Sequence, residues 1–314
     1  MSGQTAWQGQ AAIAASAVGY GVGTALSVVA LRGLRPADLL AIELAGSAAV
    51  LLAVAAATGR LRREGASRAL AQGAVLPGLS FLLGDLGLAR TTATSGALLS
   101  SIDAIATVLL SALFLRERVG RVAGAALALG TAGTILVALN APADGLVAVA
   151  GSQTLGNLLV LASMLGGAGY VVWSRSTAQP AGEGVGRTAW QFLGATVAVL
   201  PFVLGSWLTG GSRITTAEPY QLVAAAAVLL CGLGALLAFN IGIGSVSASR
   251  AGLLYTLQPL AGALTAVALL GEPVVAGQAF GGALILACLV VLTREGPTDS
   301  PTPTPAAHAV TTTN

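Results

Sequence analysis

The sequence predicts an all-α integral membrane protein of ten transmembrane helices, arranged as two inverted five-helix repeats. Three observations carry this prediction: an apolar composition, ten apolar segments of spanning length, and an internal repeat. Hydrophobic residues make up 55% of the chain and charged residues 9%, with a mean hydropathy of +0.84. Soluble domains carry about 25% charged residues, so this chain must expose much of its surface to lipid.

The apolar segments give the expected helices in order. A transmembrane helix needs about 20 mostly apolar residues. Segments that meet this requirement cover 11–31, 38–57, 73–91, 95–115, 120–140, 155–174, 189–208, 219–241, 250–270 and 274–293. No charge precedes the first segment, which argues against a cleaved signal peptide and for a retained helix.

The internal repeat relates Thr94–Val119 to Ser249–Val274, which align without a gap. Equivalent positions are Leu98 and Leu253, Asp103 and Gln258, and Glu117 and Glu272. Because each repeat would hold five spans, an odd number, the second repeat must enter the membrane upside down. Inverted repeats of this kind are a transporter architecture, with the substrate site between the halves near the midplane.

Two glycine faces extend the repeat into the next helix of each half. Gly120 and Gly124 correspond to Gly277 and Gly281, and both pairs have the small-xxx-small spacing that lets helices approach closely. Packing within one subunit and a homodimer contact both stay open for these faces.

The same segments divide the chain into five parts. We expect an N-terminal cytoplasmic segment, a first repeat, a connecting loop, a second repeat and a disordered cytoplasmic tail, at 1–10, 11–140, 141–154, 155–294 and 295–314. The tail is rich in proline and threonine, a composition that cannot bury a core.

The arginines set the expected orientation, since cytoplasmic connections carry an excess of basic residues. With the N-terminus inside, the inner connections hold eleven arginines: Arg60, Arg62, Arg63, Arg68, Arg116, Arg118, Arg121, Arg175, Arg187, Arg250 and Arg294. The outer connections hold four: Arg32, Arg35, Arg90 and Arg213. We therefore expect a multi-pass protein of the cell (plasma) membrane with both termini cytoplasmic.

Two short motifs at matching places in the repeats carry a family resemblance. Leu115-Arg116-Glu117 is followed by Gly124-Ala-Ala-Leu127, and Leu270-Gly-Glu272 is followed by Gly281-Gly-Ala-Leu284. This pattern resembles the EamA-type drug/metabolite transporter (DMT) superfamily over about residues 10–294. The resemblance implies ten helices in two inverted repeats, a central cavity, and transport of small metabolites, often outward, without nucleotide hydrolysis.

The chain departs from that superfamily at one position. The proline common in the fourth helix should fall at Ala104, whereas the second repeat keeps it as Pro259. Proline removes a backbone donor and breaks or kinks a helix. We therefore expect a break in the ninth helix rather than in the fourth.

Three carboxylates lie inside expected spans: Glu43, Asp85 and Asp103. A charge at mid-membrane costs about 2.5–3.5 kcal/mol on insertion scales, so its default interpretation is functional. Counted from the turn between their helices, both aspartates lie roughly 12–15 Å below the same membrane face. The structural alternative is a hydrogen bond to a neighbour such as Ser100, Thr107 or Asn240.

Uncharged polar residues extend the candidate site. Tyr255 and Gln258 lie one turn apart on the counterpart of the Asp103 helix, and we favour them as ligands for substrate. Tyr20 and Asn240 complete the expected substrate or proton site with Asp85, Asp103 and Glu43. Asn157, Tyr170, Trp173 and Gln191 are interpreted as packing or interfacial residues. Glu117 and Glu272 are expected to fix the turns after their helices.

Glycines cluster at equivalent points of the two repeats, at Gly19, Gly21 and Gly23 and at Gly166, Gly167 and Gly169. A phosphate-cradling loop is excluded because the chain has no lysine. Close helix crossing is the better interpretation.

These features predict a secondary active transporter that exports amino acids, amines or drug-like solutes by alternating access. Burial disfavours the charged form of a carboxyl, so one aspartate is expected to exchange a proton for substrate. We hypothesise proton antiport with Asp103 as the coupling residue, because its counterpart Gln258 cannot titrate. The expected partners are a small-molecule substrate and the bilayer, with no nucleic acid, no cofactor and no metal.

A membrane-embedded enzyme is the alternative, namely an intramembrane aspartyl protease using Asp85 and Asp103. Such enzymes have Tyr-Asp on one helix and Gly-x-Gly-Asp on the next. Here Leu82-Leu83-Gly84-Asp85 precedes Ile102-Asp103, so the order is reversed and the tyrosine and one glycine are missing. The inverted repeat also favours a transporter, since a protease does not need it.

Overall fold

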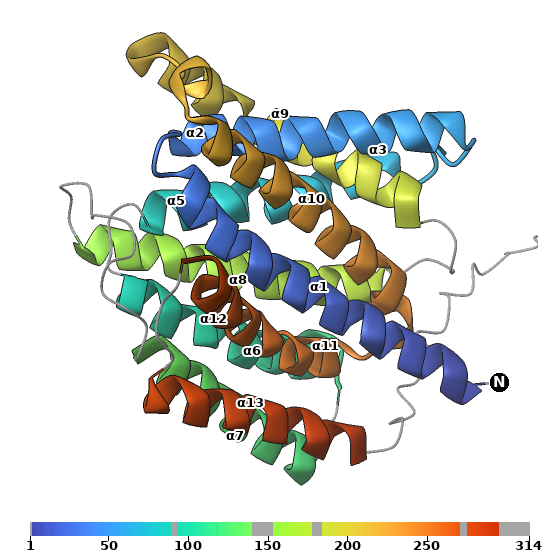
Figure 1. Ribbon diagram of the computed structural model, residues 1–314. Coiled ribbons are helices and arrows are strands. Elements are labelled where there is room, and N and C mark those ends of the chain that lie inside the picture. Colours follow the sequence, from blue (N-terminus) through green and yellow to red (C-terminus); the bar gives the residue numbers. More distant parts are fainter. Residues whose placement is uncertain are drawn as a thin grey trace, which may run out of the picture.

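The computed structural model describes residues 2–88, 93–117, 119–139, 153–177, 184–270 and 275–294 (Figure 1). All regular structure in these ranges is helical. The expected connecting loop and C-terminal tail fall almost entirely outside the described residues. The all-α prediction is therefore confirmed for the described part of the chain.

The helices of the first repeat follow the expected order. They are α1 (Ser2–Ala30); α2 (Pro36–Leu40), η1 (Ala41–Ala45) and α3 (Gly46–Ala57); α4 (Ala66–Gly73), η2 (Ala74–Leu79) and α5 (Ser80–Leu88); α6 (Ala93–Phe114); and α7 (Arg121–Leu139). Both η1 and η2 are π-helical turns that join the helices on either side.

The second repeat has matching elements. They are α8 (Gln153–Ser176); α9 (Gly184–Gly210), followed by the 3₁₀ turn η3 (Ile214–Thr216); α10 (Pro219–Gly242) with the 3₁₀ turn η4 (Ile243–Ser245); α11 (Ala248–Leu254) and α12 (Leu257–Leu270); and α13 (Ala276–Arg294).

Among the described residues, six helical segments are long and apolar enough to cross a membrane: Pro36–Ala57, Ala66–Gly87, Thr154–Ser176, Gly184–Gly210, Pro219–Ser245 and Ala248–Leu269. Three shorter apolar helices, Ile102–Phe114, Arg121–Leu136 and Ala276–Cys288, fall below that length. The chain is therefore a multi-pass membrane protein.

Three helices begin well before the apolar pattern indicated, and the first is α1, which starts at Ser2 within the expected N-terminal segment. The α4 helix starts at Ala66, within the Arg-rich stretch expected to be a loop, directly after Gly65 with a left-handed φ of 73°. The α9 helix starts at Gly184, five residues before the expected span. The added part of α4 carries Gln72 and the added part of α9 carries Arg187, which donates to Gln72 Oε1, so a pattern of apolar residues alone does not detect these turns.

The break expected near Pro259 is confirmed. Helices α11 and α12 are separated at Tyr255 and Thr256, whereas α6 runs without interruption through Ala104. A second interruption was not expected: Leu76, before Pro77, has φ −138° and ψ 126° in the middle of η2. A residue that precedes proline is pushed out of the helical region.

The helices pack in a pattern that the repeat explains. Helix α1 lies against α10 and α12, and its counterpart α8 lies against α5 and α6, the counterparts of α10 and α12 (Figure 1). Helix α3 packs on α9 and α7 on α13, so each of these contacts pairs an element with its own counterpart. Exchanging the two repeats therefore leaves the set of contacts almost unchanged.

Close crossings at glycine are confirmed for the first helix. A Cβ atom at Gly21 would collide with the backbone carbonyl of Gln258 on α12, and one at Gly19 would lie 3.1 Å from Ala235 on α10. Gly166 similarly faces Ser80 of α5. Because these glycines have no side chain, the backbones of α1 and α8 can approach their partner helices closely.

The two paired glycine faces behave differently. A Cβ atom at Gly133 of α7 would lie 2.6 Å from the carbonyl of Gly281, so Gly281 contributes to the close contact of α7 with α13. Gly124 is exposed and has no heavy atom within 4 Å of its Cβ position in the single chain. Close packing within the subunit is thus found for Gly281 and not for Gly124.

Candidate functional site

Glu43 and Asp85 form the first part of the site. Glu43 lies in the π-helical turn η1, is 7% exposed, and its carboxylate reaches the backbone of α10 at Gly232, where a Cβ atom would lie 2.5 Å from Oε1. Asp85 of α5 lies within electrostatic range of Glu43. A π-turn displaces a side chain from its regular helical direction and is frequent at functional sites, and here it carries the buried acid.

Asp103 forms the second part, on α6. The hydroxyl of Thr107, one turn later, hydrogen-bonds the carboxyl group. The other oxygen, Oδ1, is buried and has no hydrogen-bond partner among the described residues. It faces α8, where a Cβ atom at Gly167 would lie 3.6 Å away. A buried polar atom without a partner is rare enough to need an explanation.

Aromatic rings connect these acids. The ring of Tyr20 on α1 is 6.0 Å from Phe81 of α5 and 6.3 Å from Tyr255. Phe239 of α10 is 6.3 Å from Tyr255 and 5.4 Å from Tyr170 of α8. These centroid distances are those of favourable aromatic pairs.

Tyr255 is placed by the break between α11 and α12. Its hydroxyl lies 2.8 Å from Ser16 Oγ on α1, and it is within electrostatic range of Asp103. Tyr20 is in turn within electrostatic range of Tyr255 and Glu43, and its hydroxyl is buried without a partner in the described part of the chain. The helix is interrupted at Tyr255, and the side chain of this tyrosine lies among α1 and the acids.

Five of the seven expected site residues therefore form a chain of neighbours in space, in which each residue lies within electrostatic range of the next. We call this set the acid–tyrosine cluster: Asp103, Tyr255, Tyr20, Glu43 and Asp85. They come from α6, the α11–α12 break, α1, η1 and α5, so both repeats contribute.

Asn240 and Gln258 take other places. Asn240 donates to Thr188 Oγ1 at 2.9 Å and to Gln191 Oε1 at 2.6 Å, so its amide fastens α10 to α9. Gln258 meets α1 through its backbone carbonyl at Gly21. Neither contact links these side chains to the acid–tyrosine cluster.

The sequence analysis missed some members of the surroundings. Phe81, Phe239 and Ser16 were not singled out, and Tyr170 was interpreted as packing. Aromatic residues make up only 4% of the chain, so an aromatic inside a span is an unusual choice. That scarcity is the signal that points to these rings.

A fourth acid inside a span was also missed. Asp38 is fully buried at the start of α2 and accepts four hydrogen bonds, from Trp207 Nε1 (2.9 Å) and Ser212 Oγ (2.7 Å) at Oδ1 and from the backbone N–H groups of Arg213 (3.0 Å) and Arg35 (3.1 Å) at Oδ2. Asp38 is the third residue of α2, after Arg35-Pro36-Ala37, and its bond to the Arg35 N–H is that of the acid in a capping box. This carboxylate fastens α2 to the end of α9.

Glu117 has the structural role expected of it, in a more specific form. Its carboxylate accepts bonds from the N–H groups of Ala248 and Ser249, both at 2.9 Å, and from Ser249 Oγ at 2.6 Å. Ser249 Oγ also lies 2.6 Å from Ser111 Oγ. The end of α6 thus caps α11, its counterpart in the other repeat.

The geometry gives no support to the protease alternative. Two catalytic aspartates must share a proton at about 3 Å, whereas the acid that interacts with Asp85 is Glu43 and the neighbour that interacts with Asp103 is Tyr255. Helix α8 packs against both α5, which carries Asp85, and α6, which carries Asp103. Within the described residues, no group of three or more His, Cys, Asp or Glu side chains is placed to hold a metal ion.

Comparisons with known proteins agree with this arrangement. Residues 7–139 and 154–294 both match the EamA-like transporter family. No curated protein matches the chain. A solved structure titled only "Crystal structure of protein" is similar in fold, with a TM-score of 0.71 and 22% identity over 90% of this chain and 95% of that one. The chain therefore belongs to the EamA-like transporter family, part of the drug/metabolite transporter superfamily, and is a multi-pass membrane transporter.

Proposed function

We propose that this transporter exports small cationic or zwitterionic solutes, such as amino acids, amines or drug-like compounds, in exchange for protons. The acid–tyrosine cluster is the observation that carries the proposal. It holds three carboxylates and no basic residue, so the field there favours a cation. The ring faces of Tyr20, Phe81 and Tyr255 add attraction for an ammonium group.

The two unpartnered oxygens in the cluster support a ligand-binding role. Asp103 Oδ1 and the Tyr20 hydroxyl are buried without partners among the described residues. A structural hydrogen bond would have satisfied them, because an unmet buried polar group costs about 1–3 kcal/mol. Asp103 Oδ1 is therefore suited to bond a substrate ammonium or, in its absence, a proton, and the Tyr20 hydroxyl is suited to accept a hydrogen bond from the same ammonium.

Alternating access is the proposed mechanism. Glu117 and Ser111 join α6 to α11 at the arginine-rich end of the helices. The other half of the broken helix, α12, packs instead on α1. A break at Tyr255 gives the two halves of this helix separate partners, and such discontinuous helices form substrate sites in other transporters.

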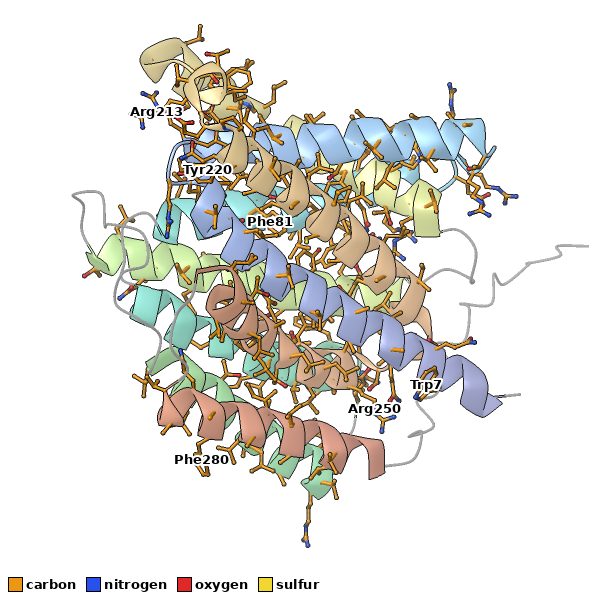
Figure 2. All side chains as sticks on the ribbon, viewed as in Figure 1. Trp7, Phe81, Arg213, Tyr220, Arg250 and Phe280 are labelled. Atoms are coloured by element: carbon orange, nitrogen blue, oxygen red, sulfur yellow. The ribbon has the colours of Figure 1, made fainter. Side chains whose placement is uncertain are left out.

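The membrane topology belongs to the same proposal. We propose ten spans, both termini in the cytoplasm and a location in the plasma membrane, with a homodimer through the Gly120/Gly124 face. Figure 2 shows Arg213 and Arg250 at opposite ends of the helix bundle, as their assignment to outer and inner connections requires.

A reconstituted system tests the proposal. Proteoliposomes are loaded with a metabolite mixture chosen by untargeted comparison of cells with and without the protein, and a pH step is applied. The wild type is expected to move a cationic or zwitterionic solute against its gradient. Asp103→Asn is expected to lose this response and keep downhill exchange. Continued uphill movement by an Asp85→Asn, Asp103→Asn double variant would rule out the proposed coupling.

A further inference from the structure

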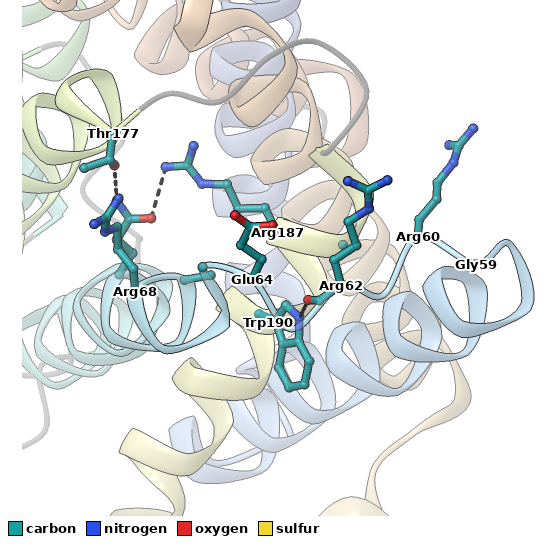
Figure 3. Close-up of a pocket in the computed structure, with 12 residues that line it drawn as sticks. Gly59, Arg60, Arg62, Glu64, Arg68, Thr177, Arg187 and Trp190 are labelled. Carbon is teal, nitrogen blue, oxygen red and sulfur yellow. Dashed lines mark hydrogen bonds between the residues drawn. The ribbon is translucent and has the colours of Figure 1, made fainter. Parts of the chain in front are cut away.

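A pocket lies at the arginine-rich end of the helices, away from the acid–tyrosine cluster. It measures about 280 Å³ and lies where the connection after α3, the start of α4, the end of α8 and the start of α9 meet (Figure 3). Four arginines and one glutamate are among its lining residues: Arg60, Arg62, Arg68, Arg187 and Glu64. The charge on its walls is therefore strongly positive.

Arg187 is held in place at the pocket. Its guanidinium donates to Gln72 Oε1 at 3.0 Å, and Gln72 is 1% exposed. Gln72 is fixed in turn by donating to Thr177 Oγ1 at 2.9 Å and by accepting from Gln191 Nε2 at 3.3 Å. This network orients the guanidinium before any ligand arrives, and such pre-organisation lowers the entropy lost on binding.

A second guanidinium lies close to the first. Arg68 of α4 is within electrostatic range of Arg187, and the two like charges repel each other. Figure 3 shows Arg68, Thr177 and Arg187 gathered at one end of the pocket, with Glu64 on the other side of Arg187. Two convergent guanidinium groups are the arrangement with which proteins bind phosphate, because each planar fork can donate two bonds to its oxygens.

The surrounding backbone adds to the positive potential. Helices α4 and α9 both begin at this pocket, and neither carries an acidic residue in its first turn. Helix N-termini carry a partial positive charge that favours anions. Trp190 closes one wall, and its indole Nε1 donates to the Arg62 carbonyl at 2.8 Å, which fastens the connection after α3 to α9.

We propose that this pocket binds a phosphate group, with Arg68 and Arg187 as its main ligands. The phosphate comes from an anionic phospholipid headgroup at the membrane surface or from a free phosphate compound. Binding would replace the repulsion between the two arginines with attraction and join α4, α8 and α9. None of the cluster residues lines the pocket, so the phosphate site is tested separately from the proposed transport cycle.

The test measures the melting temperature of the full-length protein in two arms. In detergent, inorganic phosphate is titrated against potassium chloride of equal ionic strength. In nanodiscs, phosphatidylcholine alone is compared with phosphatidylcholine containing phosphatidylglycerol. Saturable stabilisation in the first arm identifies a site for free phosphate, and stabilisation in the second arm alone identifies a lipid headgroup site.

Variants connect either result to the pocket. Arg68→Gln is expected to weaken the apparent affinity about tenfold, the effect of losing a charge-assisted hydrogen bond, and an added Arg187→Gln is expected to abolish the stabilisation. Arg68 is exposed, so the single variant remains informative if the double variant fails to fold. Arg32→Gln, Arg213→Gln removes the same charge from positions elsewhere and is expected to behave as wild type. No stabilisation in either arm, or equal losses in the control, would overturn the proposal.

Discussion

Asp38 and Asp103 are both acids within apolar helices, Asp38 fully buried and Asp103 half-buried, and their surroundings are opposite. Asp38 accepts four hydrogen bonds from donors on α9, the turn after it and its own helix start. Asp103 has the Thr107 hydroxyl and an oxygen with no partner among the described residues. The comparison teaches that the number of hydrogen-bond donors around an acid separates one that holds the fold from one with an oxygen left for a ligand or a proton.

The largest effect is expected at the structural acid. Asp38→Asn replaces an acceptor-only group with one that presents an N–H₂ to donors already in place. Losing charge-assisted bonds in a buried setting should lower the free energy of unfolding by about 3 kcal/mol. Thermal unfolding in detergent measures this, with Arg213→Gln as a control because it retains the backbone N–H. An unchanged melting temperature would remove the distinction between the two acids.

Glu117 is an intermediate case, with three donors at a helix start. Glu117→Gln is expected to cost about 1–2 kcal/mol, as for the loss of a helix cap with a charge-assisted bond. The same change should loosen α6 from α11. In a background without Cys231 and Cys288, a cysteine at Ser111 should then react faster with a polar thiol reagent. Equal labelling rates with and without the Glu117→Gln substitution would show that this contact does not close the bundle.

The tyrosines allow the same comparison without charge. Tyr255→Phe removes a hydroxyl that bonds Ser16 and should cost about 1 kcal/mol. Tyr20→Phe removes a hydroxyl without a partner in the described structure, so stability should stay equal or rise slightly. Melting curves of the two single variants provide the comparison. A greater loss of stability in Tyr20→Phe than in Tyr255→Phe would contradict the expectation that the hydroxyl with a hydrogen-bond partner matters more.

The smallest effect on stability is expected at Asp103. Asp103→Asn removes a carboxylate that is poorly satisfied, so the free energy of unfolding should change by less than about 1 kcal/mol. Transport driven by a pH step should nevertheless disappear. Measuring both quantities on one preparation separates the two effects. A strongly destabilised variant would instead assign Asp103 the structural role of Asp38.

The sequence was sufficient for features that depend on local chemistry. Apolar runs located the helices, Pro259 located the break before α12, and charges within apolar runs located Glu43, Asp85 and Asp103. Apolar runs and the charges within them are recognised from the transfer free energy of neighbouring residues, and Pro259 is recognised from the restriction it places on the backbone. Both properties depend only on residues close together in the chain.

Features that depend on distant partners could not be obtained in this way. Asp38 is also an acid in an apolar run, and its donors Trp207 and Ser212 follow about 170 residues later. The Nδ2 group of Asn240 finds its acceptors on α9 for the same reason. The added turns of α4 and α9 are likewise joined to each other, through Gln72 and Arg187.

The pairing of α1 with α10 and α12, and of α8 with α5 and α6, has a consequence for how the chain is assembled. Neither repeat contains the helices that its own first helix packs against. The first 140 residues made alone would leave the glycine faces of α1 without α10 and α12. A stable molecule made from one repeat would need a second copy inserted in the opposite orientation. Joining both copies in one polypeptide fixes their ratio at one to one and their orientations in the membrane as opposite. Separate copies would reach that arrangement only if half of them inserted in each orientation.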